Sequence, residues 1–181
     1  TPSYAAVTFN TNASTLALGS SSCTGGGLSV NCGGITLTYN PISSTTALNP
    51  SNVNFGSLTT ACVGTCNSLQ SLAGLVLNLV ITQTAPTPGS GSLPSGILSG
   101  GVLTNGSNAQ ITFGAGSLSI GNVTYAITNN PLDIVPPTSG VNGDPTAGTT
   151  TIQGIVREVP EPSTWLMMMA GFGALGFALR R

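Results

Sequence analysis

The chain has 181 residues, of which 40% are hydrophobic and only 4% are charged, and its formal net charge is −1. Lysine and histidine are absent, and the first charged side chain is Asp133, whereas soluble domains usually carry about 25% charged residues. Nucleic-acid binding is excluded because there is no Lys and Arg cluster to neutralise phosphates. Ser-His-Asp and Cys-His catalysis are excluded because there is no histidine.

Short strands are predicted along the whole body, which we place at residues 1–157. Apolar and polar residues alternate in residues 4–10, 34–40 and 123–128, as in half-buried strands. Residues 72–84 are nearly continuously apolar. They fit a short helix or a central strand covered on both faces, and their β-branched residues favour the strand.

Turn-forming residues separate these runs. Residues 136–149 fit a loop or a linker, and we favour the loop because the following residues alternate well enough to pair within the body. The expected fold is all-β: an antiparallel β-sandwich of about ten strands, followed by a short C-terminal apolar helix.

The four cysteines are Cys23, Cys32, Cys62 and Cys66. Two disulfides are favoured over a zinc site, because a structural zinc site of four cysteines usually has short spacings in both halves and the first pair is too far apart. Of the possible connectivities we prefer Cys23–Cys32 and Cys62–Cys66, although spacing alone does not fix the pairing.

The acidic residues of the body offer little chemistry. A glycosidase needs two carboxylates placed across a sugar, and only Asp133 and Asp144 are available for that role. The same two could join backbone carbonyls around calcium, but solvated turn aspartates are the favoured interpretation. We therefore expect a protein that is not an enzyme and needs no cofactor, with calcium as the one alternative.

The segment 158–181 has a composition of its own. Two prolines flank Glu161, an apolar run from Trp165 to Leu179 follows, and Arg180 and Arg181 come after it. The run fits a helix at about residues 164–179, about 23 Å long, which is short of the ~30 Å hydrocarbon core. Transient membrane insertion with both arginines on the cytoplasmic side is expected. Residues 171–176 match G-x-G-x-x-G, but they lack the strand and acidic residue of a dinucleotide site.

Residues 159–181, VPEPSTWLMMMAGFGALGFALRR, resemble the PEP-CTERM sorting signal of Gram-negative bacteria. The resemblance implies recognition by exosortase, a membrane-embedded cysteine protease, at a box formed by Pro160, Glu161, Pro162 and Ser163. It also implies a membrane segment with the residues Trp165, Leu166, Met167, Met168, Met169, Phe172, Leu175, Phe177 and Leu179, and a basic stop at Arg180 and Arg181. The body loosely resembles the β-rich ectodomains that precede such signals.

The expected protein is exported to the outer cell surface or extracellular matrix, with a precursor tethered to the membrane. Its leading function is that of a structural protein associated with exopolysaccharide in a biofilm. One alternative is a subunit of an extracellular fibre or pilus-like filament held by β-strand addition, because lysine, which usually guards strand edges, is absent. The second alternative is a carbohydrate-binding module that stacks sugars on aromatic side chains.

Overall fold

A computed structural model of the chain describes residues 6–48, 50–64, 66–139, 145–159, 168–170 and 172. Before residue 160 the described residues form 21 strands in five sheets, and all of their pairings are antiparallel. The expected antiparallel β fold is confirmed. The number of strands and sheets is larger than in the expected two-sheet sandwich of about ten strands, which is not confirmed. Single residues divide several apolar runs into two strands that belong to different sheets.

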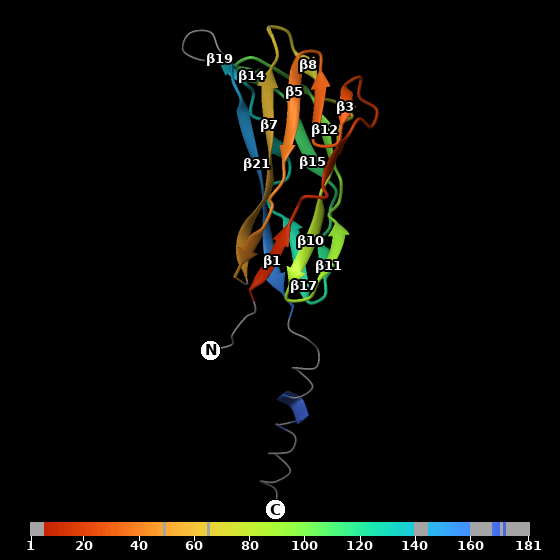
Figure 1. Cartoon of the computed structure of the whole chain (residues 1–181), viewed down its shortest axis with the longest axis vertical. Coiled ribbons are helices and arrows are strands. Elements are labelled where there is room, and N and C mark those ends of the chain that lie inside the picture. The colour runs from red at the N-terminus through yellow and green to blue at the C-terminus, as the bar shows by residue number, and fades with distance from the viewer. Residues whose placement is uncertain are drawn as a thin grey trace, which may run out of the picture.

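The largest sheet has seven strands in the order β16-β17-β21-β7-β5-β4-β3. Their bounds are β3 Thr24–Gly26, β4 Ser29–Cys32, β5 Ile35–Asn40, β7 Ser51–Cys62, β16 Leu118–Ile120, β17 Val123–Ile127 and β21 Gly148–Glu158. The central pair, β7 and β21, has 12 and 11 residues and runs along the elongated body (Figure 1). The last strand therefore belongs to the body, as its alternation predicts.

Four smaller sheets complete the body. A four-stranded sheet, in the order β11-β10-β1-β6, contains β1 Val7–Asn10, β6 Thr45–Ala47, β10 Val80–Ala85 and β11 Gly89–Ser92. A five-stranded sheet, β18-β15-β12-β9-β2, contains β2 Thr15–Ala17, β9 Val76–Asn78, β12 Gly96–Ser99, β15 Gln110–Phe113 and β18 Leu132–Asp133. The remaining strands are β8 Gln70–Ser71, β13 Gly101–Leu103 and β14 Gly106–Ser107 in one sheet, and β19 Thr138–Ser139 and β20 Pro145–Thr146 in another.

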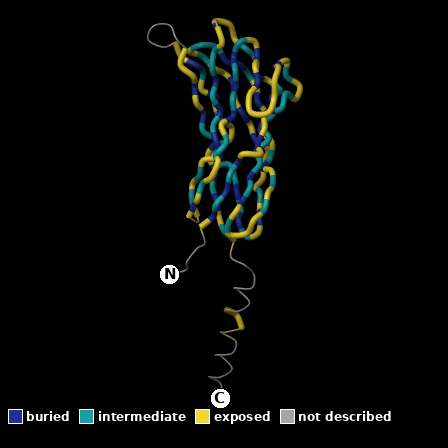
Figure 2. The backbone as a smooth tube through the Cα atoms, in the orientation of Figure 1, coloured by how far each residue is buried: buried dark blue, intermediate teal, exposed yellow. Residues whose placement is uncertain are grey.

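One hydrophobic core runs through the body (Figure 2). It follows from period-two alternation: in β5 the apolar Ile35, Leu37 and Tyr39 are buried, while the threonines between them lie toward the outside. Phe9 of β1 packs edge-on against Phe55 of β7, with ring centroids 5.8 Å apart. The four-stranded sheet is thereby packed against the seven-stranded sheet.

Within residues 72–84, residues 76–78 and 80–84 form strands, as favoured, residues 73–74 form a turn, and no helix is present. Leu75, Leu77, Leu79 and Ile81 are fully buried, but the residues between them are half-buried, so one face is covered more than the other. The segment divides at Leu79, where the chain passes from β9 in the five-stranded sheet to β10 in the four-stranded sheet.

Two adjacent asparagines connect the seven-stranded and five-stranded sheets. The Asn129 side chain donates to the Thr151 carbonyl over 3.1 Å and accepts the Gln153 N–H over 3.0 Å, which continues the β17–β21 ladder beyond Ile127. The Asn130 side chain accepts the Phe113 N–H and donates to the Phe113 carbonyl, both over 2.9 Å. Each side-chain amide thus replaces a backbone partner where the chain changes sheets.

The two ends of the seven-stranded sheet are chemically different. Cys32, Ile35 and Cys62 lie in register across β4, β5 and β7 at one end. At the other end Val123 pairs with Glu158, and the described chain leaves the body there, near the start of β1 (Figure 1). The cysteines therefore lie at the end of the body opposite the one where β21 ends at Glu158.

Candidate functional site

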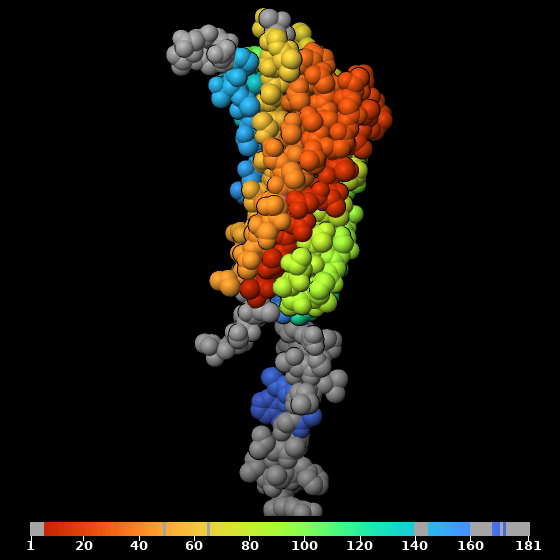
Figure 3. Space-filling model, viewed as in Figure 1, coloured from red at the N-terminus to blue at the C-terminus, as the bar shows by residue number. Residues whose placement is uncertain are grey.

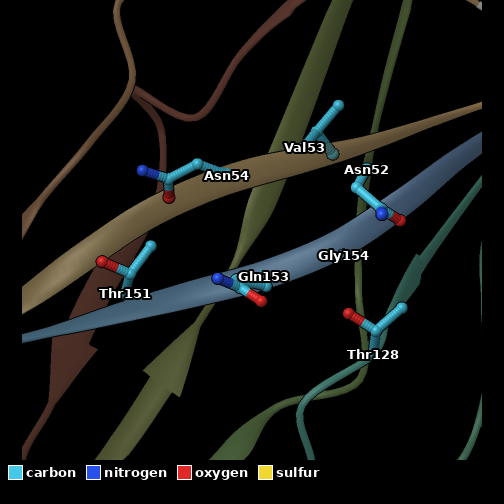
Figure 4. A pocket seen from close by; sticks show the side chains of 7 residues that line it. All are labelled: Asn52, Val53, Asn54, Thr128, Thr151, Gln153 and Gly154. Atoms are coloured by element: carbon cyan, nitrogen blue, oxygen red, sulfur yellow. The ribbon is translucent and has the colours of Figure 1, made fainter.

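A groove with a volume of about 470 Å³ crosses the pair β7 and β21 (Figure 4). It is lined by Asn52, Val53, Asn54, Thr128, Thr151, Gln153 and Gly154. Every polar side chain in this set is a neutral amide or hydroxyl. The groove can offer hydrogen-bond donors and acceptors to a polar ligand, but it holds no carboxylate, thiol or imidazole for acid–base or nucleophilic chemistry.

The groove forms where β7 and β21 shift register. Thr151 pairs with Ser57 but Gln153 pairs with Asn54, so two residues of β7, Phe55 and Gly56, lie opposite a single residue of β21. This is the arrangement of a β-bulge, which bends a strand and re-aims its side chains. On the groove side the Asn54 Oδ1 accepts the Gly56 N–H over 2.7 Å.

Two glycines make this bulge possible. Gly56 has φ of +116°, which side chains rarely adopt, and a Cβ there would lie 2.6 Å from the Tyr39 hydroxyl. Gly154 lies under the Phe55 ring, and a Cβ there would also lie 2.5 Å from the Ala126 carbonyl oxygen. The rings of Tyr39 and Phe55 pack closely against these two glycines and hold the backbone at the bottom of the groove in place.

Several groove side chains have unused hydrogen-bonding capacity. Asn52, Thr128 and Gln153 are exposed, and within the described ranges their side chains make no hydrogen bond to the protein. Their amide and hydroxyl groups are available to a ligand without first breaking an internal bond.

A second, larger groove of about 780 Å³ lies beside β14, β15 and β18. Its lining includes Asp133, whose Oδ1 accepts a 2.7 Å hydrogen bond from the Gln110 Nε2. Asp144, the other residue of the calcium alternative, lies outside the described residues. Across the described ranges no three His, Cys, Asp or Glu residues gather as metal ligands would.

The four predicted cysteines form two disulfides, Cys23–Cys32 and Cys62–Cys66, with Cα atoms 4.4 and 5.9 Å apart. The preferred pairing is the one observed. The alternative of a four-cysteine zinc site is wrong, because each sulfur is already bonded to another sulfur and no thiolate remains.

The aromatic side chains of the body lie in its core. The described ones are all at most 3% exposed: Phe9, Tyr39, Phe55, Phe113 and Tyr125. Burial raises the pKa of Tyr39 and of Tyr125 above the usual range, because a phenolate is poorly solvated in an apolar interior. The Tyr125 hydroxyl donates to the Gln83 Oε1 over 2.5 Å. These rings cannot serve as a stacking platform for sugars.

The end of β21 is fastened by one asparagine. The Asn122 Nδ2 donates to the Glu158 Oε1 over 2.7 Å, and the Val159 N–H donates to the Asn122 carbonyl over 2.6 Å. The predicted recognition box, residues 160–163, follows directly but lies outside the described residues.

Little of the predicted membrane segment is described. Residues 168–170 and 172 are helical, and Met168, Met169 and Phe172 are 55–67% exposed. The other residues of this prediction, and Arg180 and Arg181, lie outside the described part. No helix in the described ranges is both long and apolar enough to span a membrane.

The family model of the PEP-CTERM protein-sorting motif matches residues 158–181. The chain carries a PEP-CTERM sorting motif. The motif implies a secreted protein that is processed by exosortase. No curated protein and no solved structure matches the chain.

Sequence reasoning identified the sorting motif and the cysteines but missed the groove. Its residues come from β7, from β21 and from the turn after β17, and only strand pairing brings them together. One signal was present: Phe55-Gly56 interrupts the alternation within β7, and an isolated glycine inside a strand indicates a bulge.

Proposed function

We propose that this secreted protein is a non-enzymatic component of the outer cell surface or extracellular matrix, and that its body binds neutral polysaccharide. The observation that carries the proposal is the absence of charge: residues 6–132 contain no Asp, Glu, Lys or Arg. Such a surface can form hydrogen bonds with a neutral polyol. It offers no opposite charges to compensate for the desolvation of the carboxylates or phosphates of a charged polymer.

The groove supports the same ligand class. Its exposed amides and hydroxyls have the mixed donor and acceptor character of sugar hydroxyls. Arg157 is the one cation among the described residues, and it lies four residues beyond Gln153 along β21. An acidic polysaccharide would find no cluster of cations on the described body, so neutral polymers are favoured.

The position of the sorting motif agrees with this role. The motif follows the end of β21 that pairs with β17, whereas both disulfides lie at the opposite end of the seven-stranded sheet. In a membrane-tethered precursor the disulfide-bonded end would therefore face away from the membrane, in the compartment where disulfides persist.

Affinity electrophoresis tests the proposal. The full chain is run through gels containing dextran, laminarin or hydroxyethylcellulose as neutral polymers, or alginate as an acidic one. We expect retardation by at least one neutral polymer that does not change with salt, because there is little charge to screen. The variant N52A/Q153A, which removes two exposed groove amides, should migrate faster in that gel. Retardation by alginate alone would contradict the proposal.

A second candidate is a self-assembling fibre subunit held by strand addition, since no lysine guards the strand edges. The described edge strands disfavour strand addition. The strands β2, β3, β6, β11, β16 and β18 have two to four residues each, and short edge strands hinder pairing with another chain. Filaments of the purified chain in negative-stain micrographs would establish it. The aromatic-stacking carbohydrate module is not proposed, because the described aromatic side chains of the body are buried.

A further inference from the structure

The outward face of the seven-stranded sheet carries an ordered row of hydroxyl groups. Ser29, Thr38, Thr59 and Thr149 lie on four adjacent strands, and their Cα positions pair in sequence across β4, β5, β7 and β21. Neighbouring strands are about 4.8 Å apart, so the row is about 14 Å long. In Figure 3 this face extends from the orange atoms of β4 and β5 across the yellow of β7 to the blue edge of β21.

A second row lies beside the first. Asn40, Ser57 and Thr151 pair in the same way across β5, β7 and β21. Thr151 also lines the groove described above, so this row leads directly into it. We call the two rows together with the groove the polar track.

Internal hydrogen bonds hold the track in place. The Ser29 and Thr38 hydroxyls are 3.1 Å apart, and the Asn40 Nδ2 donates to the Thr59 Oγ1 over 2.7 Å. Each hydroxyl has one donor and two acceptor sites, so bonding capacity remains at both partners after these contacts. Side chains that are already ordered lose less entropy on binding.

The chemistry of the track favours a long polymer over a small sugar. With neither charges nor exposed aromatic rings, each contact is a neutral hydrogen bond with a net value of only about 1 kcal/mol. Useful affinity then requires many contacts repeated along one ligand. A protein partner is disfavoured, because stable protein interfaces have an apolar, aromatic-rich centre, and the two rows contain only Ser, Thr and Asn.

We propose that the polar track binds the interior of an extended neutral polysaccharide chain, over several consecutive sugar units. This inference rests on the proposed function and adds to it the site and the form of the ligand. It requires affinity to increase with chain length, and it requires the two hydroxyl rows, beyond the groove itself, to contribute to binding.

The test compares two matched double substitutions in the full chain. T38V/T59V replaces two track hydroxyls by methyl groups of the same shape. T8V/T46V makes the same change at Thr8 and Thr46, whose hydroxyls lie 3.1 Å apart on β1 and β6 of the four-stranded sheet. Binding is measured by affinity electrophoresis in the neutral polymer that retards the wild type, with glucose and short oligosaccharides of that polymer as competitors.

We expect T38V/T59V to weaken polymer binding by about 30-fold, since two hydrogen bonds are lost, with T8V/T46V unchanged. Competition should improve steadily from glucose to longer oligosaccharides. Equal binding by the two variants would overturn the inference while leaving the proposed function intact, and so would competition by glucose as effective as that by oligosaccharides. If no neutral polymer retards the wild type, the proposed function itself fails. Thermal melting checks that both variants are folded.

Discussion

Replacing Asn130 by alanine tests whether side-chain amides carry strand pairing between the sheets. The substitution removes two hydrogen bonds to the backbone of Phe113, on the edge of β15 that faces β18, where the backbone pairing with β18 ends at Ile111. Each bond contributes about 0.5–1.5 kcal/mol, so the free energy of unfolding should fall by about 2 kcal/mol. For a domain of this size that lowers Tm by about 4–8 °C.

The assay is thermal melting followed by circular dichroism, with two companion variants. N130D keeps an acceptor for the Phe113 N–H but turns an oxygen toward the Phe113 carbonyl, so it should recover none of the second bond. N52A removes an exposed amide that has no hydrogen bond within the described ranges, and it should change stability by less than about 0.5 kcal/mol. If N130A melts at the same temperature as N52A, the reasoning is refuted.

Three further predictions concern packing, disulfides and pH. G154A should destabilise by about 1–3 kcal/mol through overpacking against Phe55, whereas G106A, whose new Cβ meets only ordinary contacts, should be nearly neutral in the same urea titration. Reduction of both disulfides should cost about 4–5 kcal/mol by loop-closure entropy, and an unchanged urea midpoint in reductant would refute this. Burial raises the pKa of Tyr39 and Tyr125 in the folded state, so stability is full below about pH 10 and falls above it by at most ~1.4 kcal/mol per unit for each tyrosine. With no histidine or lysine in the chain, Tm should be flat from about pH 5 to 9, and a titration step near pH 6.5 would contradict it.

Much of the strand content could be predicted because it depends on local alternation. The pattern in residues 34–40 and 123–128 reappears as β5 and β17. The number of sheets could not be predicted, because the alternation of Leu77, Leu79 and Ile81 continues unbroken while the chain passes from one sheet to another. Strands in both sheets bury one face, so the alternation of apolar and polar residues looks the same where the chain passes from one sheet to the other.

The candidate site was less accessible to sequence reasoning. The cysteines are close in sequence, so spacing favoured the correct pairs. The groove and the hydroxyl rows depend on register between strands as distant as β5 and β21. A bulge of one residue changes which side chains share a face of the sheet. In a sequence this rich in Ser, Thr and Asn, the positions of the polar residues do not indicate which of them become neighbours on adjacent strands.

The most direct test of neutral polysaccharide binding is retention of the protein in the extracellular matrix of the producing cells after a wash in about 1 M salt, where the screening length is only ~3 Å. The account predicts that the wild type stays in the matrix and that N52A/Q153A, equally folded and equally exported, is released into the medium. Release of the wild type by salt would contradict the account, as would equal retention of both proteins.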